Sequence, residues 1–155
     1  FSTPAEVQDT IRQLGTDDPK VISTYVTDDP GLDAARVRAQ VDALIAKCRD
    51  RGIRFDMRPK VKPAILDEYY TPGTPLAGRC LYPFLYARVS FSGKAYFCPF
   101  IRLEVGDLTQ QSLEEVWTGP RYVALRKKLV EARLFPVCRR CCKVELDGQP
   151  AGSAL

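Results

Sequence analysis

The chain has 155 residues, of which 45% are hydrophobic and 27% are charged, and its formal net charge is +4. This composition is that of an ordinary globular protein, and the small, dispersed positive charge forms no basic stripe for nucleic acid. No run of about 18 apolar residues occurs, so no membrane-spanning helix is expected. Histidine is absent, which excludes imidazole-based catalysis and histidine-ligated metal sites.

Residues 3–14 are predicted to form the first helix. The segment TPAE, which begins at Thr3, has the spacing of a capping box with proline at the first helical position. Apolar residues then recur at helical intervals until Gly15, a residue type that commonly ends helices.

Two strands and a longer helix are expected next. Residues 20–27 (KVISTYVT) and 53–57 (IRFDM) have the residue types of strands. Residues 34–48 between them carry an apolar stripe that ends at Cys48, which we expect to be a buried small hydrophobe. A strand–helix–strand unit implies parallel pairing, and parallel sheets normally contain more strands. We therefore expect residues 1–66 to be an incomplete unit, completed by an upstream region or another chain. The alternative is a small α+β domain that borrows the later hairpin.

Residues 67–79 are predicted to be a linker, because this region is rich in proline and glycine. Tyr69 and Tyr70 within it either line a substrate cavity at a domain junction or pack in the linker. Residues 80–155 are predicted to form a small α+β domain. It would contain a β-hairpin that turns at Gly93, followed by helices.

The helices of this second region have clear start signals. Ser112 is followed by glutamate at the capping-box position, and Thr118-Gly119-Pro120 begins a further helix. Trp117 and Tyr122 are expected to pack these helices on the hairpin.

Four of the six cysteines have an ordered spacing. Cys80 and Cys98 flank the predicted hairpin with 17 residues between them, and Cys138 and Cys141 follow the last helix after 39 more. A helix that returns to a hairpin would bring both pairs to one centre. Four thiolates suit either zinc or a [4Fe–4S] cluster, and the spacing leaves both open. No export signal is visible, so we expect reduced thiols and a cytoplasmic location rather than disulfides.

Neighbouring residues leave two further alternatives open. Arg79, Arg139, Arg140 and Lys143 adjoin the four cysteines in sequence. They would either offset the charge of a loaded centre and hydrogen-bond its sulfurs, or be solvated surface cations. Cys142, directly after Cys141, is either a spare thiol or an alternative ligand.

The segment CLYPFLYARVSFSGKAYFC has the form C-x12-G-x4-C and resembles the opening of SPASM and twitch domains. These domains are the C-terminal auxiliary-cluster regions of radical S-adenosylmethionine enzymes. The following CPFIRLEVGDLTQQSLEEVWTGPRYVALRKKL and the closing FPVCRRC are similar to the rest of such a domain, so the resemblance runs from Cys80 to Cys142. By this resemblance Cys80, Cys98, Cys138 and Cys141 would ligate one auxiliary [4Fe–4S] cluster, as in the shorter twitch form.

The resemblance also implies a fold and a function. The fold class would be α/β: residues 1–66 as the terminal βα units of a partial barrel, the linker 67–79, and a twitch-like α+β domain at 80–155. The function would be iron–sulfur binding and electron transfer in a radical S-adenosylmethionine oxidoreductase that acts on a peptide or another small molecule. The motif C-x3-C-x2-C is absent, so the S-adenosylmethionine site is expected in an N-terminal region or a separate subunit. The alternative is a four-cysteine zinc module, structural or partner-binding, without enzymatic activity.

Overall fold

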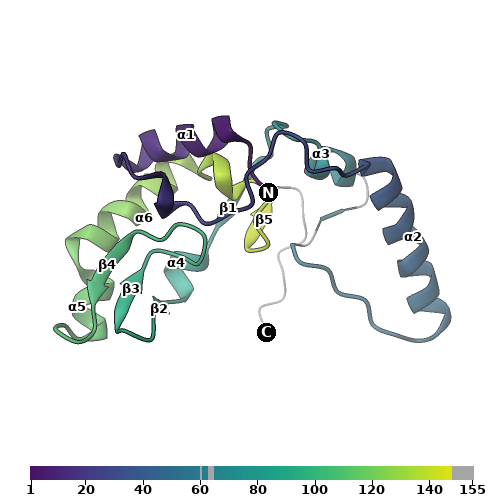
Figure 1. Ribbon diagram of the computed structural model, residues 1–155. Coiled ribbons are helices and arrows are strands. Elements are labelled where there is room, and N and C mark those ends of the chain that lie inside the picture. Colours follow the sequence, from purple (N-terminus) through teal and green to yellow (C-terminus); the bar gives the residue numbers. More distant parts are fainter. Residues whose placement is uncertain (60, 63–64, 148–155) are drawn as a thin grey trace.

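A computed structural model describes residues 1–59, 61–62 and 65–147, so residues 148–155 of the predicted second domain lie outside the described part (Figure 1). No helix in that part is long and apolar enough to cross a membrane. The helices are α1 (Pro4–Leu14), η1 (Pro19–Val21), α2 (Ala34–Asp50), α3 (Leu66–Tyr70), α4 (Tyr82–Leu85), α5 (Leu113–Thr118), α6 (Pro120–Ala132) and η3 (Pro136–Cys138). The strands are β1 (Gly78–Cys80), β2 (Arg88–Val89), β3 (Lys94–Tyr96), β4 (Glu104–Asp107) and β5 (Val144–Leu146). They form two small antiparallel sheets, β1–β5 and β2–β3–β4.

The predicted start of α1 is confirmed. The Glu6 backbone N–H donates to the Thr3 side chain at 3.2 Å, and the Glu6 carboxylate accepts from the Thr3 backbone N–H at 2.9 Å. This reciprocal pair satisfies backbone donors that an α-helix leaves free at its N-terminus. Gly15 ends the helix in the left-handed conformation, at φ 73°.

The main core lies between α1, the three-stranded sheet and the helices α5 and α6. Its buried aromatic centre is Phe97, which contacts Tyr122 edge-on at 5.9 Å and Phe135 at 6.5 Å between ring centroids. The remaining buried side chains of this core are Val7, Ile11, Leu14, Val21, Ala95, Ile101, Val105, Val116, Leu125, Leu129 and Val137. Because α1 contributes to it, the N-terminal helix is packed onto the cysteine-bearing part of the chain.

A second, smaller core joins the region of α3 to the C-terminal strand β5. Its buried members are Val61, Leu66, Tyr69, Leu76, Leu134, Val144 and Leu146. Both cores therefore contain residues from before and after the linker expected at 67–79, part of which is the ordered helix α3. The division into domains at residues 66 and 80 stays a prediction.

The two strands expected before residue 60 do not form regular strands. Residues 20–27 include the end of η1 and take part in two isolated bridges, Ser2 with Val26 and Ile22 with Ile101. Residues 53–57 have no regular structure. A strand needs a neighbour to complete its backbone hydrogen bonds, and the described residues provide no neighbouring strand for either segment. The resulting fold is a mixture of helices with small antiparallel sheets, compatible with a small α+β domain, and the described residues show no partial barrel.

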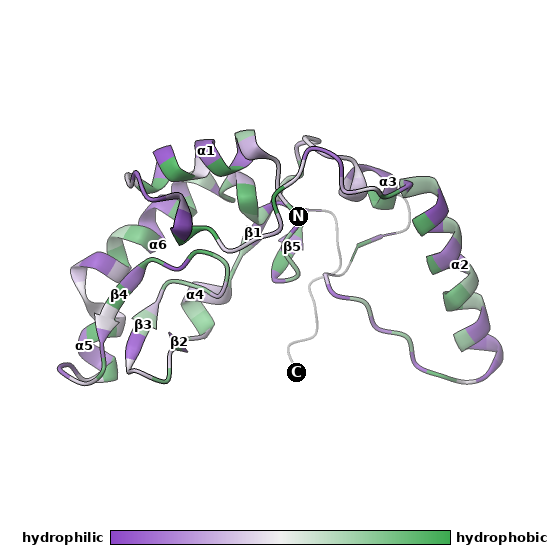
Figure 2. Ribbon diagram, in the orientation of Figure 1, coloured by the Kyte–Doolittle hydropathy of each residue, from purple (hydrophilic) through white to green (hydrophobic). Residues whose placement is uncertain are grey.

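The helix α2 forms as predicted, but it has no buried residue. Leu44 remains 47% exposed. Cys48 is half-buried, so the prediction that it is a buried small hydrophobe is wrong. Figure 2 shows both apolar and hydrophilic residues along α2, which extends away from the sheets and contacts mainly α3.

The predicted hairpin is present but shorter than expected. Gly93 makes the turn between β2 and β3 at φ 81°, and a Cβ there would lie 2.6 Å from the Thr109 Cγ2 atom. The residues after Cys80 form the short helix α4 rather than a strand, because Pro83 at its start has the φ of a first helical turn and cannot donate to a ladder.

Candidate metal centre

Two parts of the fold bring the predicted cysteine pairs toward one another. β1 pairs with β5, and Cys80 lies directly across from Val144, which is two residues beyond Cys142. Cys98 follows β3 directly after Phe97, whose ring packs on Phe135 at the start of the C-terminal cysteine loop. The hairpin end and the C-terminal loop thus face the same region, while the four-cysteine site itself stays a prediction.

The thiols influence one another electrostatically. Burial raises the pKa of Cys98 to about 11 and the pKa of Cys141 to about 12. Burial also raises the pKa of Cys80, and it raises the pKa of Cys138 well above the ordinary value. The next causes that raise the pKa of Cys138 are the nearby thiols of Cys98, Cys80 and Cys141. Without a cation the four groups are therefore neutral thiols at pH 7, because ionised sulfurs here would be poorly hydrated and would repel each other.

Backbone N–H groups point at several of the sulfurs. The Ile101 N–H donates to Cys98 Sγ at 3.1 Å, and the Lys143 N–H donates to Cys141 Sγ at 3.4 Å. A backbone hydrogen bond from Tyr82 similarly lowers the pKa of Cys80, opposing the effect of burial. Such bonds stabilise the thiolate form that binds a metal or a cluster.

The C-terminal pair lies on a tight turn. The Cys141 N–H donates to the Cys138 carbonyl oxygen at 3.1 Å, and the Cys138 N–H donates to the Phe135 carbonyl oxygen at 2.8 Å. This C-x2-C turn is the local geometry in which two cysteines face one ion. Among the residues that the structure describes, however, no group of three or more His, Cys, Asp or Glu side chains is spaced to hold a metal ion. The thiols are near enough to affect the pKa of Cys138, but they are not spaced as the ligands of one ion. Their chemistry, rather than their present spacing, suits a bound cation.

Arg140, between the two cysteines of this turn, is not a solvated surface cation, and its hydrogen bonds go to oxygens rather than to sulfurs. Its side chain is 1% exposed, and it donates to Glu6 Oε1 at 3.1 Å, to the Tyr69 carbonyl at 2.8 Å and to the Thr74 carbonyl at 2.9 Å. A further bond goes to the Thr71 carbonyl. Arg140 thus joins the cysteine turn to α1 and to the segment after α3.

Each of the other three cations near the cysteines also lies beside an acidic or aromatic side chain. Arg79 forms an exposed ion pair with Glu145 across β1 and β5 at 2.9 Å. Arg139 lies 3.7 Å from the same Glu6 oxygen that Arg140 contacts. The Lys143 ammonium lies 5.9 Å from the Tyr82 ring centroid. No hydrogen bond from these side chains to a sulfur is found in the described part of the chain.

Arg126 supports the site in a way that the sequence analysis missed. Its guanidinium lies 4.0 Å from the Trp117 ring centroid and 3.9 Å from that of Tyr122, and it donates to the Pro83 carbonyl at 2.8 Å. Pro83 belongs to α4, which begins at Tyr82, two residues after Cys80. The backbone of Tyr82 is also hydrogen-bonded to the Cys80 thiol. The signal was present, since Tyr122 and Arg126 are four residues apart and face the same side of a helix.

Comparison with known proteins agrees with this picture. Residues 80–142 match the SPASM family model, which is described as an iron-sulfur cluster-binding domain. No curated protein matches the chain, and no solved structure matches it. The matched segment begins at Cys80, ends at Cys142 and contains the other three predicted ligands. The match supports iron–sulfur binding by this segment and leaves the individual ligands as predictions.

Proposed function

We propose that Cys80, Cys98, Cys138 and Cys141 hold one [4Fe–4S] cluster. The observation that carries this proposal is that all four cysteines lie in the segment that matches an iron-sulfur cluster-binding domain. Cys80, Cys98 and Cys141 are also near enough to Cys138 to raise its pKa. Buried neutral thiols are costly to ionise, and a cationic core removes that cost when it displaces the protons.

The protein contributes preorganisation around such a centre. The pairing of β1 with β5 fixes Cys80 beside the C-terminal loop, and the turn at Cys138 fixes the other end. Backbone N–H groups that already point at Cys98 and Cys141 would remain hydrogen-bonded to the sulfurs. Hydrogen bonds to the sulfurs and burial are the means by which a protein sets the potential of a cluster.

We further propose that the cluster transfers electrons as the auxiliary centre of a radical S-adenosylmethionine oxidoreductase. A [4Fe–4S] cluster supplies one-electron chemistry, and four cysteine ligands would leave no iron open to a substrate. The 155 residues contain no C-x3-C-x2-C motif, so an N-terminal region or a separate subunit would provide the S-adenosylmethionine site. Residues 1–66 would then be the terminal βα units of its partial barrel. Residues 20–27 and 53–57 form no regular strand here, so they would need neighbouring barrel strands to pair with, and α2 would then gain a surface to cover.

The test is metal and sulfide analysis of anaerobically reconstituted protein. We expect a brown protein with about four irons and four sulfides. Cys98→Ala should lose this loading, whereas the matched control Cys48→Ala should keep it, because Cys48 lies on α2. One zinc, no sulfide and no colour in anaerobically purified protein would instead establish the zinc module, since four thiolates also suit zinc.

A further inference from the structure

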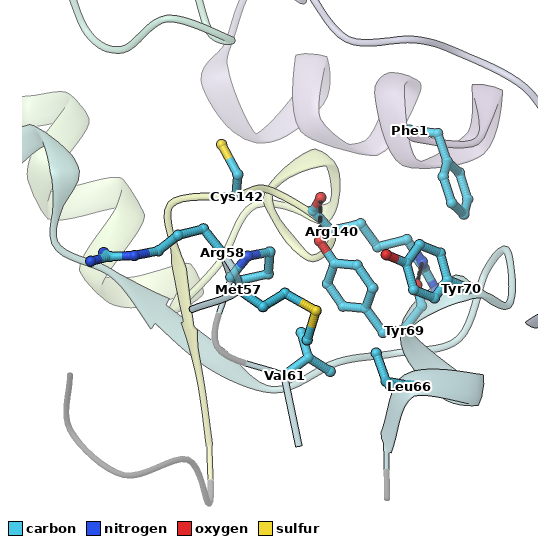
Figure 3. Close-up of a pocket in the computed structure, with 10 residues that line it drawn as sticks. Phe1, Met57, Arg58, Val61, Leu66, Tyr69, Tyr70, Arg140 and Cys142 are labelled. Atoms are coloured by element: carbon cyan, nitrogen blue, oxygen red, sulfur yellow. Dashed lines mark hydrogen bonds between the residues drawn. The ribbon is translucent and has the colours of Figure 1, made fainter. Parts of the chain in front are cut away.

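A cavity of about 170 Å³ lies beside the C-terminal cysteine turn. Its lining is mainly apolar and aromatic and includes Phe1, Met57, Leu66, Tyr69 and Tyr70. Figure 3 shows the Met57 and Leu66 side chains next to the Tyr69 ring, with Phe1 and Tyr70 beyond it. A dry apolar cavity of roughly 150 Å³ is large enough to bind benzene, so the volume suits a single small ring.

The wall nearest the cysteines is held firmly in place. Tyr69 is 6% exposed and Leu66 is fully buried. The Tyr69 hydroxyl donates to the Arg140 carbonyl oxygen at 2.9 Å, while the Arg140 side chain donates to the Tyr69 carbonyl oxygen at 2.8 Å. This reciprocal pair connects α3 to the turn between Cys138 and Cys141. A guest that contacts Tyr69 therefore touches a side chain that is hydrogen-bonded to the backbone of the cysteine turn.

The lining favours an aromatic guest over an aliphatic one. Tyr69 and Tyr70 already meet edge-on, with ring centroids 5.1 Å apart at 84°, and a third ring can extend this arrangement. The Arg140 guanidinium lies 5.4 Å from the Phe1 ring centroid, so a cation faces the aromatic side of the cavity. The Met57 thioether adds a polarizable group that makes favourable contacts with ring edges.

We propose that this cavity binds a small aromatic ring and that its occupancy is sensed at the Cys138–Cys141 turn through Tyr69 and Arg140. The binding part stands on the cavity alone. The sensing part rests on the proposed cluster. The ring belongs either to a free small molecule or to an aromatic side chain of a peptide, and the two sources can be separated experimentally.

The experiment is a ¹⁹F NMR titration of the full 155-residue protein with 4-fluorophenol. A second titration uses a capped tripeptide whose central residue is 4-fluorophenylalanine. We expect saturable binding of at least one probe, and tighter binding of the peptide identifies a peptide source. In Met57→Trp, the indole fills the cavity and should weaken binding at least tenfold. Val123→Trp, at a half-exposed position on α6, is the matched control and should bind as the parent does.

A second variant covers a failure of Met57→Trp to fold. Tyr70→Leu removes one ring of the lining at a half-buried position and should also weaken binding at least tenfold. The proposal is overturned if neither probe binds, or if a folded Met57→Trp or Tyr70→Leu binds as tightly as the control. These titrations use zinc-loaded protein and so do not depend on iron. The sensing part is tested by electron paramagnetic resonance of the reduced cluster: an unchanged spectrum with the cavity saturated would refute it.

Discussion

Replacing Arg140 with methionine should destabilise the protein by about 3 kcal/mol, at the lower end of the 3–5 kcal/mol typical of breaking a buried ion pair. The change leaves the buried Glu6 carboxylate without its main partner and removes donors from the carbonyls of Tyr69, Thr71 and Thr74. Arg139 remains 3.7 Å from the Glu6 oxygen and retains part of the attraction, which is why the lower value is expected. Small domains are stable by only about 5–15 kcal/mol.

Urea unfolding of zinc-loaded protein measures this loss as a shift in midpoint. The matched control is Arg79→Met, which removes a cation from the exposed pair with Glu145 and should cost less than about 1 kcal/mol. Arg140→Lys keeps the charge but lacks the planar fork, so it should fall between the two. If Arg140→Met and Arg79→Met unfold at the same urea concentration, the contacts of Arg140 with α1 and with the segment after α3 do not stabilise the protein.

Two further predictions concern the metal-free thiols and the hairpin turn. Because burial raises the pKa of Cys98 to about 11 and the pKa of Cys141 to about 12, the thiols of the unfolded chain, with an ordinary pKa of about 8.5, ionise first as pH rises. The free energy of unfolding of the metal-free protein should therefore be at its full value below pH ~8.5. Above that pH it should fall by up to about 1.4 kcal/mol per pH unit for each thiol. Urea midpoints at pH 7.5 and 10 measure this, and a flat profile would show that the thiols are exposed. Gly93→Ala should cost more than Gly52→Ala, because both have positive φ but only Gly93 meets a neighbour, Thr109, at 2.6 Å. The left-handed conformation alone costs about 1–2 kcal/mol, so thermal unfolding that ranks the two variants equally would contradict the crowding at Gly93.

Features with local signals could be predicted from the sequence. The capping boxes at Thr3 and Ser112, the turn at Gly93 and the helix that begins at Pro120 all depend on residues within a few positions of each other. The spacing of the four cysteines is likewise read directly from the sequence. Each of these signals acts through backbone geometry that no distant contact overrides.

Features that depend on distant partners could not be predicted. Residues 20–27 have strand composition, yet a strand forms only where another strand is placed to pair with it. The same limit applies to Arg140, because the sequence shows its neighbours Cys138 and Cys141 but not Glu6, which is distant in sequence and packed against it. The prediction that Cys48 is buried is wrong for the same reason, since the apolar stripe of α2 is only partly covered by α3 and the second core in the described chain.

The pairing of β1 with β5 has a consequence for the two ends of the cysteine-bearing segment. Cys80 and Val144 are cross-strand neighbours, so entry and exit of the unit occur at one place. The two-stranded ribbon therefore closes residues 80–144 into a loop whose two ends cannot move independently of each other.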